Sequence, residues 1–146
     1  MQTNELRIGN YVSDDEDDSI MIVSSIEDPQ YTRWNSGDEF NIVCRASSTT
    51  YFEGEFKPIE LTEGWILQLG FKKVKLETAL KDFYIEYYQK DNFVVYILSD
   101  FFEVELITKS GEQFNLFKTF KKEIHILQNL YFSLMGEELE LELYKD

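Results

Sequence analysis

The sequence is dominated by short runs of β-branched and aromatic residues with polar turns between them. In the first part of the chain these runs cover residues 6–12, 20–26, 40–46 and 51–56. Runs of this length, bounded by turn residues, are typical of strands in a small barrel or a curled sheet. Residues 1–57 are therefore predicted to form a small β-rich unit.

An acidic loop separates the first two runs, LRIGNYV and IMIVSSI. Gly9 and Asn10 interrupt the first run, as a bulge or a turn does. Two runs joined in this way resemble the opening hairpin of SH3-like barrels. The resemblance implies an SH3-like barrel or a curled β-sheet for the first unit.

Pro58 marks the predicted boundary to a second unit, residues 58–146. Proline disfavours helical backbone at the residue before it and cannot donate to a sheet ladder. A helix is predicted over about 62–69, because Thr62 is a good N-cap and Gly70 is placed to end the helix in a left-handed conformation.

An antiparallel β-meander is predicted over about 82–117. Apolar residues recur there with a period of two, and the run 93–98 is apolar on both faces, as in a central strand. Residues 109–112 read as a hairpin turn.

A second helix is predicted over about 120–135, with Gly136 as its C-terminal stop and the meander as its packing surface. After it, alternation of leucine with glutamate predicts a terminal strand over about 138–144. The whole chain is therefore predicted to have an α+β fold, in which the two units share one core.

Charge and composition exclude several function classes. The chain has 28 acidic and 14 basic residues, for a net charge of −14, which disfavours direct binding to DNA, RNA or an anionic membrane. No stretch approaches the roughly 18 apolar residues that a membrane span needs. One cysteine cannot form an internal disulfide, so a reducing cytoplasm suits the chain best.

No catalytic constellation is visible in the sequence. The seven glycines form neither a dinucleotide-binding nor a phosphate-binding motif, and no cluster of cysteine and histidine has metal-ligand spacing. We therefore expect a protein without cofactor that is not an enzyme.

The densest charge run is Asp14, Asp15, Glu16, Asp17 and Asp18. Carboxylates in a loop are suitable ligands for calcium or magnesium, but the glycine and glutamate that an EF-hand loop requires are replaced by serine here. We interpret the run as a solvated hairpin loop, with a cation site as the alternative, and include it in a candidate interaction surface.

His125 is the single histidine of the chain. Gln128 and Asn129 follow it at three and four residues, which places three polar side chains on one face of the predicted helix. A structural role is the main interpretation for His125 and a ligand-binding role is the alternative. The three residues are part of the candidate surface.

Arg33 and Trp34 lie in a polar loop between two predicted strands. A tryptophan in such a loop either packs back over the sheet or anchors a partner, because Trp and Arg are enriched at interface hot spots. Both residues complete the candidate surface.

Three blocks of the sequence resemble a known family: NELRIGNYV, KPIELTEGWILQLGF and IHILQNLYFSLMGEELEL. The family consists of short proteins of prophages and mobile elements of gut-type anaerobic bacteria, and it has no assigned activity. The resemblance implies an accessory protein of a mobile element that acts in the host cytoplasm.

The function predicted from these observations is non-catalytic binding of a protein partner. The alternative is a nucleic-acid mimic whose carboxylates imitate phosphates and block a host DNA-binding enzyme. We also expect that the terminal strand can pair with a second copy of the chain if it lies at a sheet edge.

Overall fold

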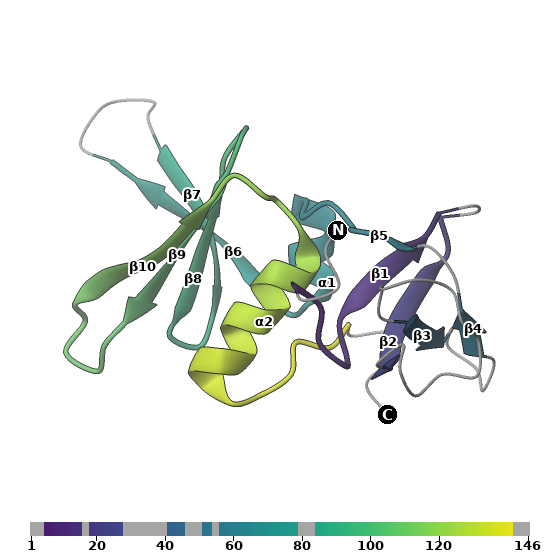
Figure 1. The fold of residues 1–146 in the computed structure, drawn as a ribbon. Helices are drawn as coiled ribbons and strands as arrows, with labels where there is room; N and C mark the ends of the chain where they lie inside the picture. The colour runs from purple at the N-terminus through teal and green to yellow at the C-terminus, as the bar shows by residue number, and fades with distance from the viewer. Residues whose placement is uncertain are drawn as a thin grey trace. The chain divides into compact units, whose positions relative to one another are not determined.

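The computed structural model describes residues 5–15, 18–27, 41–45, 51–53, 56–78 and 84–141. Contacts along the chain divide it into two compact units. Unit 1 consists of Met1–Glu60 and Glu123–Glu138, and unit 2 consists of Leu61–Lys122 and Leu139–Asp146. Within the described residues, each unit contains one antiparallel five-stranded sheet and one helix, which makes the fold α+β as predicted (Figure 1).

The sheet of unit 1 has the strand order β4-β3-β2-β1-β5. Its strands are β1 (Tyr11–Asp14), β2 (Ile20–Glu27), β3 (Asn41–Arg45), β4 (Tyr51–Glu53) and β5 (Phe56–Lys57). The last strand returns to pair with the first, and the pairs Ser13 with Lys57 and Asp14 with Phe56 set its register. Among the described residues no pairing joins β4 to β5, so the sheet is curled and open there and not a closed barrel.

The predicted break in the first run falls at Gly9. Its φ of +92° lies in the left-handed region, which disfavours residues other than glycine. The backbone N–H of Gly9 donates to the carbonyl of Val23, and the N–H of Val23 donates to the carbonyl of Asn10. The segment before β1 therefore stays bonded to β2 although it leaves the regular ladder.

The core of unit 1 lies on one face of β1 and β2. It contains the buried side chains of Leu6, Val12, Met21 and Val23, with the half-buried Ile26 and Phe56 packed against them. A register shift between Val23 and Ser25 interrupts the pairing of β2 with β3, and such bulges increase the local bend of a strand.

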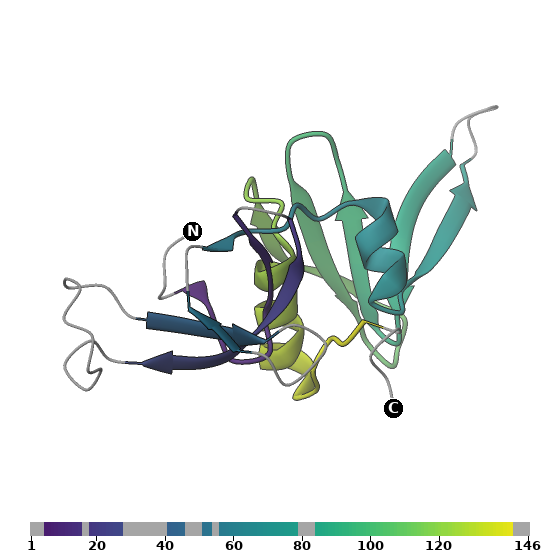
Figure 2. The same cartoon turned by 90° about the vertical axis from the view of Figure 1, so that its right-hand side faces the viewer.

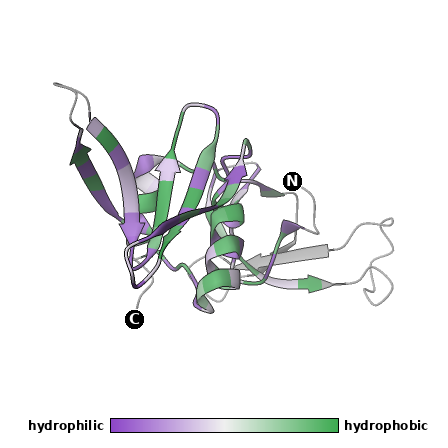
Figure 3. Cartoon of the chain, turned by 90° about the vertical axis from the view of Figure 1, so that its left-hand side faces the viewer, coloured by the Kyte–Doolittle hydropathy of each residue, from purple (hydrophilic) through white to green (hydrophobic). Residues whose placement is uncertain are grey.

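Helix α2 (Ile124–Met135) belongs to unit 1 and contacts β1. Figure 3 shows mostly hydrophobic residues along it. It begins four residues later than predicted, because Glu123 has extended backbone and forms an isolated β-bridge with Glu60. Gly136 ends the helix with a φ of +73°, as predicted. Contacts group α2 with unit 1, whereas the sequence analysis places this helix in the second unit with the meander.

The sheet of unit 2 has the strand order β10-β9-β8-β7-β6, a continuous meander. Its strands are β6 (Lys72–Glu77), β7 (Tyr84–Lys90), β8 (Phe93–Ile97), β9 (Phe102–Ile107) and β10 (Gln113–Thr119). The prediction of a meander is confirmed for β7 to β10. Edge strand β6 was not predicted, because the lysines in its sequence KKVKLE hide the apolar alternation.

Helix α1 (Glu63–Gln68) lies one residue inside the predicted range of 62–69 at each end, with Thr62 and Leu69 as its caps. The hydroxyl of Thr62 accepts a hydrogen bond from the N–H of Trp65 at the first turn. At the end, the N–H of Gly70 donates to Leu67 and the N–H of Phe71 donates to Ile66, which is the Schellman arrangement. The helix lies beside β6 (Figure 2), where Glu63 forms an ion pair with Lys73.

The core of unit 2 lies on the sheet face toward α1. It includes the fully buried side chains of Ile66, Leu69, Phe93, Val95, Phe102 and Val104. The rings of Phe71 and Phe93 pack edge to face with centroids 6.1 Å apart, an arrangement that aromatic quadrupoles favour.

Residues 138–141 do not form the predicted terminal strand, and residues 142–144 lie outside the described part of the chain. Leu139 and Leu141 are nevertheless buried, while Glu140 between them is exposed. The alternate leucines are thus buried although residues 138–141 are not themselves in a strand. Among the described helices, none is long and apolar enough to cross a membrane.

Candidate functional site

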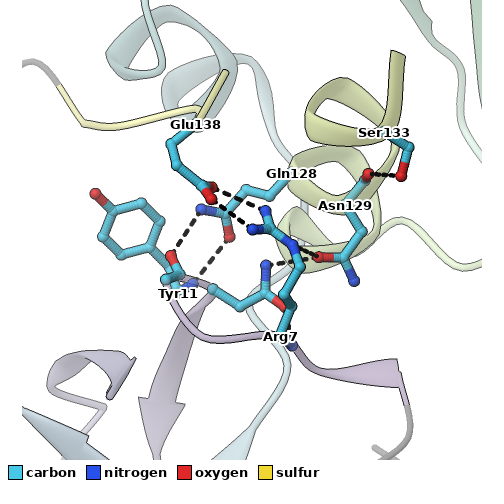
Figure 4. A network of polar contacts seen from close by, with 8 residues as sticks. Arg7, Tyr11, Gln128, Asn129, Ser133 and Glu138 are labelled. Atoms are coloured by element: carbon cyan, nitrogen blue, oxygen red, sulfur yellow. Dashed lines mark hydrogen bonds and ion pairs between the residues drawn. The ribbon is translucent and has the colours of Figure 1, made fainter. Parts of the chain in front are cut away.

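Polar side chains of α2 bind the backbone of the segment before β1 (Figure 4). The side-chain oxygen of Gln128 accepts a hydrogen bond from the N–H of Tyr11 at 2.9 Å, and its amide nitrogen donates to the carbonyl of Gly9 at 3.2 Å. Gln128 is 0% exposed. Burial of an amide is tolerated only when its hydrogen bonds are replaced, and here both ends of the amide have backbone partners.

One residue further, Asn129 connects three points of the same segment. Its oxygen accepts hydrogen bonds from Arg7 Nε at 3.2 Å and from the side-chain nitrogen of Asn10 at 2.9 Å. Its nitrogen donates to the carbonyl of Glu5 at 2.8 Å. Asn129 therefore holds residues 5–10 against the helix.

Arg7 adds a charged contact to this network. Its guanidinium binds both carboxylate oxygens of Glu138, at 2.5 and 2.8 Å, and stacks over the ring of Phe132 with 4.0 Å between Cζ and the ring centroid. Two parallel bonds to one carboxylate fix the geometry more strictly than a single bond does.

The three polar residues predicted on one face of α2 therefore have different positions. Gln128 and His125 are 0% exposed, so they do not lie on an exposed surface, whereas Asn129 is half-buried. Burial corrects the prediction that His125 and Gln128 contribute to a surface. The sequence shows the helical face but not the backbone groups that face it.

His125 lies in a group of three metal-ligating residues, with Glu5 and Glu123. One ligand atom from each side chain lies within 4.8 Å of those of the other two. His125 Nε2 is 3.4 Å from a carboxylate oxygen of Glu123. The side chain of His125 is fully buried and that of Glu123 is 22% exposed. Sequence reasoning missed both glutamates, and for Glu123 its position two residues before the histidine was an available signal.

The predicted acidic loop is described in part. Asp14 ends β1, and Asp15 and Asp18 are exposed, whereas Glu16 and Asp17 lie outside the described residues. Asp18 has a φ of +61° and forms an ion pair with Lys57. The hydrogen bond that the Lys57 ammonium donates to the carboxylate of Asp18 is the main cause that raises the pKa of Lys57.

Arg33 and Trp34, the remaining residues of the candidate surface, also lie outside the described part of the chain.

The meander of unit 2 exposes an apolar patch, which sequence reasoning did not single out. It consists of Val74, Leu76, Ile85, Tyr87 and Tyr96. Leu76 lies opposite Ile85, and Val74 lies opposite Tyr87, so all four share one sheet face. The rings of Tyr87 and Tyr96 extend it to β8 with centroids 5.6 Å apart. Leu76 is 51% and Ile85 42% exposed.

Carboxylates adjoin this patch. The hydroxyl of Tyr96 donates to Glu105 at 3.3 Å. Burial of the phenol, followed by the negative charge of Glu105, raises the pKa of Tyr96. The phenol therefore remains neutral at physiological pH and keeps its hydrogen to donate.

A cavity of about 420 Å³ opens beside the same face and is lined by Gly70, Lys72, Val74, Gln89, Lys90 and Asp91. The two lysines of this lining have different surroundings. The ammonium of Lys90 donates a hydrogen bond to the carbonyl of Leu69 at 3.0 Å. Lys72 is an exposed residue of edge strand β6. The cavity contains no candidate nucleophile with an adjacent base.

Comparisons of the chain with protein-family models, with curated proteins and with solved structures find no match.

Proposed function

We propose that the chain is a non-catalytic protein-binding module and that the apolar patch of unit 2 is its contact surface. The observation that carries the proposal is the exposure of this patch. Contiguous apolar side chains on a sheet face are expensive to leave in water, and exposed patches of this kind mark sites of protein association.

The composition of the patch also supports a protein partner. Tyrosine is enriched at interface cores, because a rigid ring buries a large area at a small entropic cost. Tyr87 and Tyr96 are half-buried and packed against each other before any partner binds. The surface is thus partly preorganised, which reduces the entropy lost on association.

Two further parts of the proposal rest on the sequence resemblances. An accessory role for a mobile element, in the host cytoplasm, is what the three blocks in the sequence imply. An SH3-like barrel for unit 1 is supported by the return of β5 to β1, the first strand of the unit. Backbone NOEs between β4 and β5 in solution would support closure into a barrel.

The test is capture of partners from host lysate by the tagged full-length protein, with and without nuclease. The double variant Leu76→Ser, Ile85→Ser removes two exposed side chains of the patch. The matched control is Leu134→Ser, an exposed leucine of α2 in unit 1. We expect a salt-resistant partner whose affinity falls by about tenfold or more in the double variant and is unchanged in the control.

Equal capture by the double variant and the wild type would contradict the patch as the contact surface. Recovery of a DNA-processing enzyme through a contact that is lost at high salt would indicate the nucleic-acid mimic instead. The net charge of −14 favours that alternative through steering onto a basic surface.

A further inference from the structure

The side chains of Glu5, Glu123 and His125 meet at a place where the backbone of each is fixed. Glu123 is held by its β-bridge to Glu60. Its neighbour Ile124 donates a hydrogen bond to the carbonyl of Ile59 at 2.9 Å. His125 lies in the first turn of α2. The three ligands therefore come from a framework that exists before any ion binds.

The backbone of Glu5 is also held by α2. Its carbonyl accepts the hydrogen bond from Asn129, which lies one turn after His125 on the same face of α2. The backbone of Glu5 is thus tied to the helix face that carries the imidazole. This tie explains how residues 118 or more positions apart in sequence bring their side chains within 4.8 Å.

The spacing of the ligand atoms suits a first-row transition metal. Bonds of about 2.0–2.2 Å to a tetrahedral zinc ion separate neighbouring ligand atoms by about 3.4 Å. His125 Nε2 and the carboxylate of Glu123 are 3.4 Å apart. The ligand atom of Glu5 lies within 4.8 Å of the other two, so it is at most about 1.4 Å from the same spacing.

The choice of ligands also separates this group from ordinary surface carboxylates. A fully buried imidazole selects zinc, cobalt, nickel or iron over magnesium and calcium, which prefer oxygen ligands. The positive end of α2 disfavours a cation near His125. The two negative charges of Glu5 and Glu123 offset that cost, so the group as a whole is suited to a divalent ion.

We propose that Glu5, Glu123 and His125 bind one divalent transition-metal ion, with Zn²⁺ as the representative ion. Three protein ligands leave at least one coordination position for water. The bound ion would join the segment before β1 to the start of α2. The proposal concerns unit 1 and is independent of the protein-binding role proposed for unit 2.

The test uses the untagged full-length protein, treated with a chelator, dialysed and titrated with ZnCl₂ in excess Mg²⁺. Because the chain has a single histidine, its imidazole NMR signals report on this site alone. We expect one equivalent of Zn²⁺ by calorimetry, a shift of the imidazole signals that is complete at that equivalent, and a melting temperature that rises with Zn²⁺ concentration.

Matched variants then test whether each of the two carboxylates is a ligand of the ion. Glu5→Gln and Glu123→Gln preserve side-chain volume and are each expected to weaken Zn²⁺ binding by at least about tenfold. Glu77→Gln on β6 removes the same charge in the other unit and is expected to leave the affinity unchanged. Circular dichroism confirms that each variant is folded.

Unchanged imidazole signals up to about 1 mM Zn²⁺ would overturn the proposal, whatever the variants do. Equal weakening by Glu77→Gln would also overturn it, because the effect would then come from net charge. Imidazole signals that shift in the wild type and keep their free positions in Glu5→Gln and Glu123→Gln at the same Zn²⁺ concentration would establish the three-residue site.

Discussion

The side chain of Gln128 takes the place of a neighbouring strand as the hydrogen-bond partner of the backbone N–H of Tyr11. The backbone N–H of Tyr11 donates to the side-chain oxygen of Gln128 at 2.9 Å, although the two residues are 117 positions apart. The same side-chain amide also donates to the carbonyl of Gly9, just before β1, at 3.2 Å. A helix side chain thus completes the hydrogen bonding of a strand that begins beside a glycine break.

Substitution Gln128→Leu is expected to lower the free energy of unfolding by about 2 kcal/mol or more. The leucine fills the space but leaves a buried donor at Tyr11 and a carbonyl at Gly9 without their partner, and each such loss costs about 1–3 kcal/mol. Urea denaturation measures the change. The exposed Gln113 is the control, and Gln113→Leu should change stability by less than about 0.5 kcal/mol. Similar effects of the two variants would contradict the role of Gln128.

Arg7→Lys is expected to destabilise the protein by about 1 kcal/mol. Lysine keeps the charge but cannot bind both oxygens of Glu138 and also donate to Asn129, and it loses the planar stack on Phe132. Thermal unfolding at low and high salt measures the effect. Lys109→Arg, at an exposed turn, is the reciprocal control and should be neutral. If Arg7→Lys left stability unchanged, the double contact of the guanidinium with Glu138 would contribute nothing beyond its charge.

Two glycine substitutions at opposite ends of α1 are expected to change the free energy of unfolding in opposite directions. Gly70→Ala places a side chain at a φ of +84° and should cost about 1 kcal/mol. Gly64→Ala lies inside the helix, where the new Cβ meets Thr62 Oγ1 at an ordinary 3.8 Å, and should stabilise by about 0.5 kcal/mol. Denaturant midpoints of the two variants test the sign, and a loss of stability in both would contradict the assignment.

Stability should fall on the acid side partly through Glu63. The hydrogen bond from Lys73, followed by that from Tyr88, lowers the pKa of Glu63 below its ordinary value of 4.5. A carboxyl with a lowered folded-state pKa stabilises the fold above its unfolded-state pKa, and this contribution is lost as pH falls through the folded-state pKa. Glu63→Gln should therefore reduce the loss of stability from pH 4.5 downward.

Urea midpoints from neutral pH to about pH 3 measure this dependence. Glu77→Gln, a second acidic residue beside the same edge of the sheet, is the control and should keep the wild-type acid profile. An unchanged profile in Glu63→Gln would contradict the contribution of the Glu63–Lys73 pair. The exposure of Glu63 limits the size of the effect.

Local chemistry was enough to predict the elements whose signals lie within a few residues. Helix α1 agrees with its predicted range to within one residue at each end, because Thr62 caps one end and Gly70 closes the other through bonds to residues inside the same helix. The turn at 109–112 was also predictable from local residues, because Gly111 adopts a φ of +86° that favours glycine. These interactions are short in sequence and need no distant partner.

The candidate site was only partly predictable, since its residues come from distant segments. The helical spacing of His125, Gln128 and Asn129 was visible, but the groups that they face, Tyr11 and Glu5, are more than 110 positions away. The apolar patch requires the register of β6 on β7, and the lysines of β6 concealed that strand.

By itself the sequence determined the α+β class, the meander and the caps and turns, because these depend on periodicity and on residues adjacent in the chain. Tertiary structure alone decided where α2 begins and which unit it joins. The extended pairing of Glu123 with Glu60 delays the helix start, and backbone donors and acceptors of the segment before β1 satisfy its buried amides. Such long-range hydrogen bonds override local propensity, because a buried polar group without a partner costs more than a residue's preference for helix or strand.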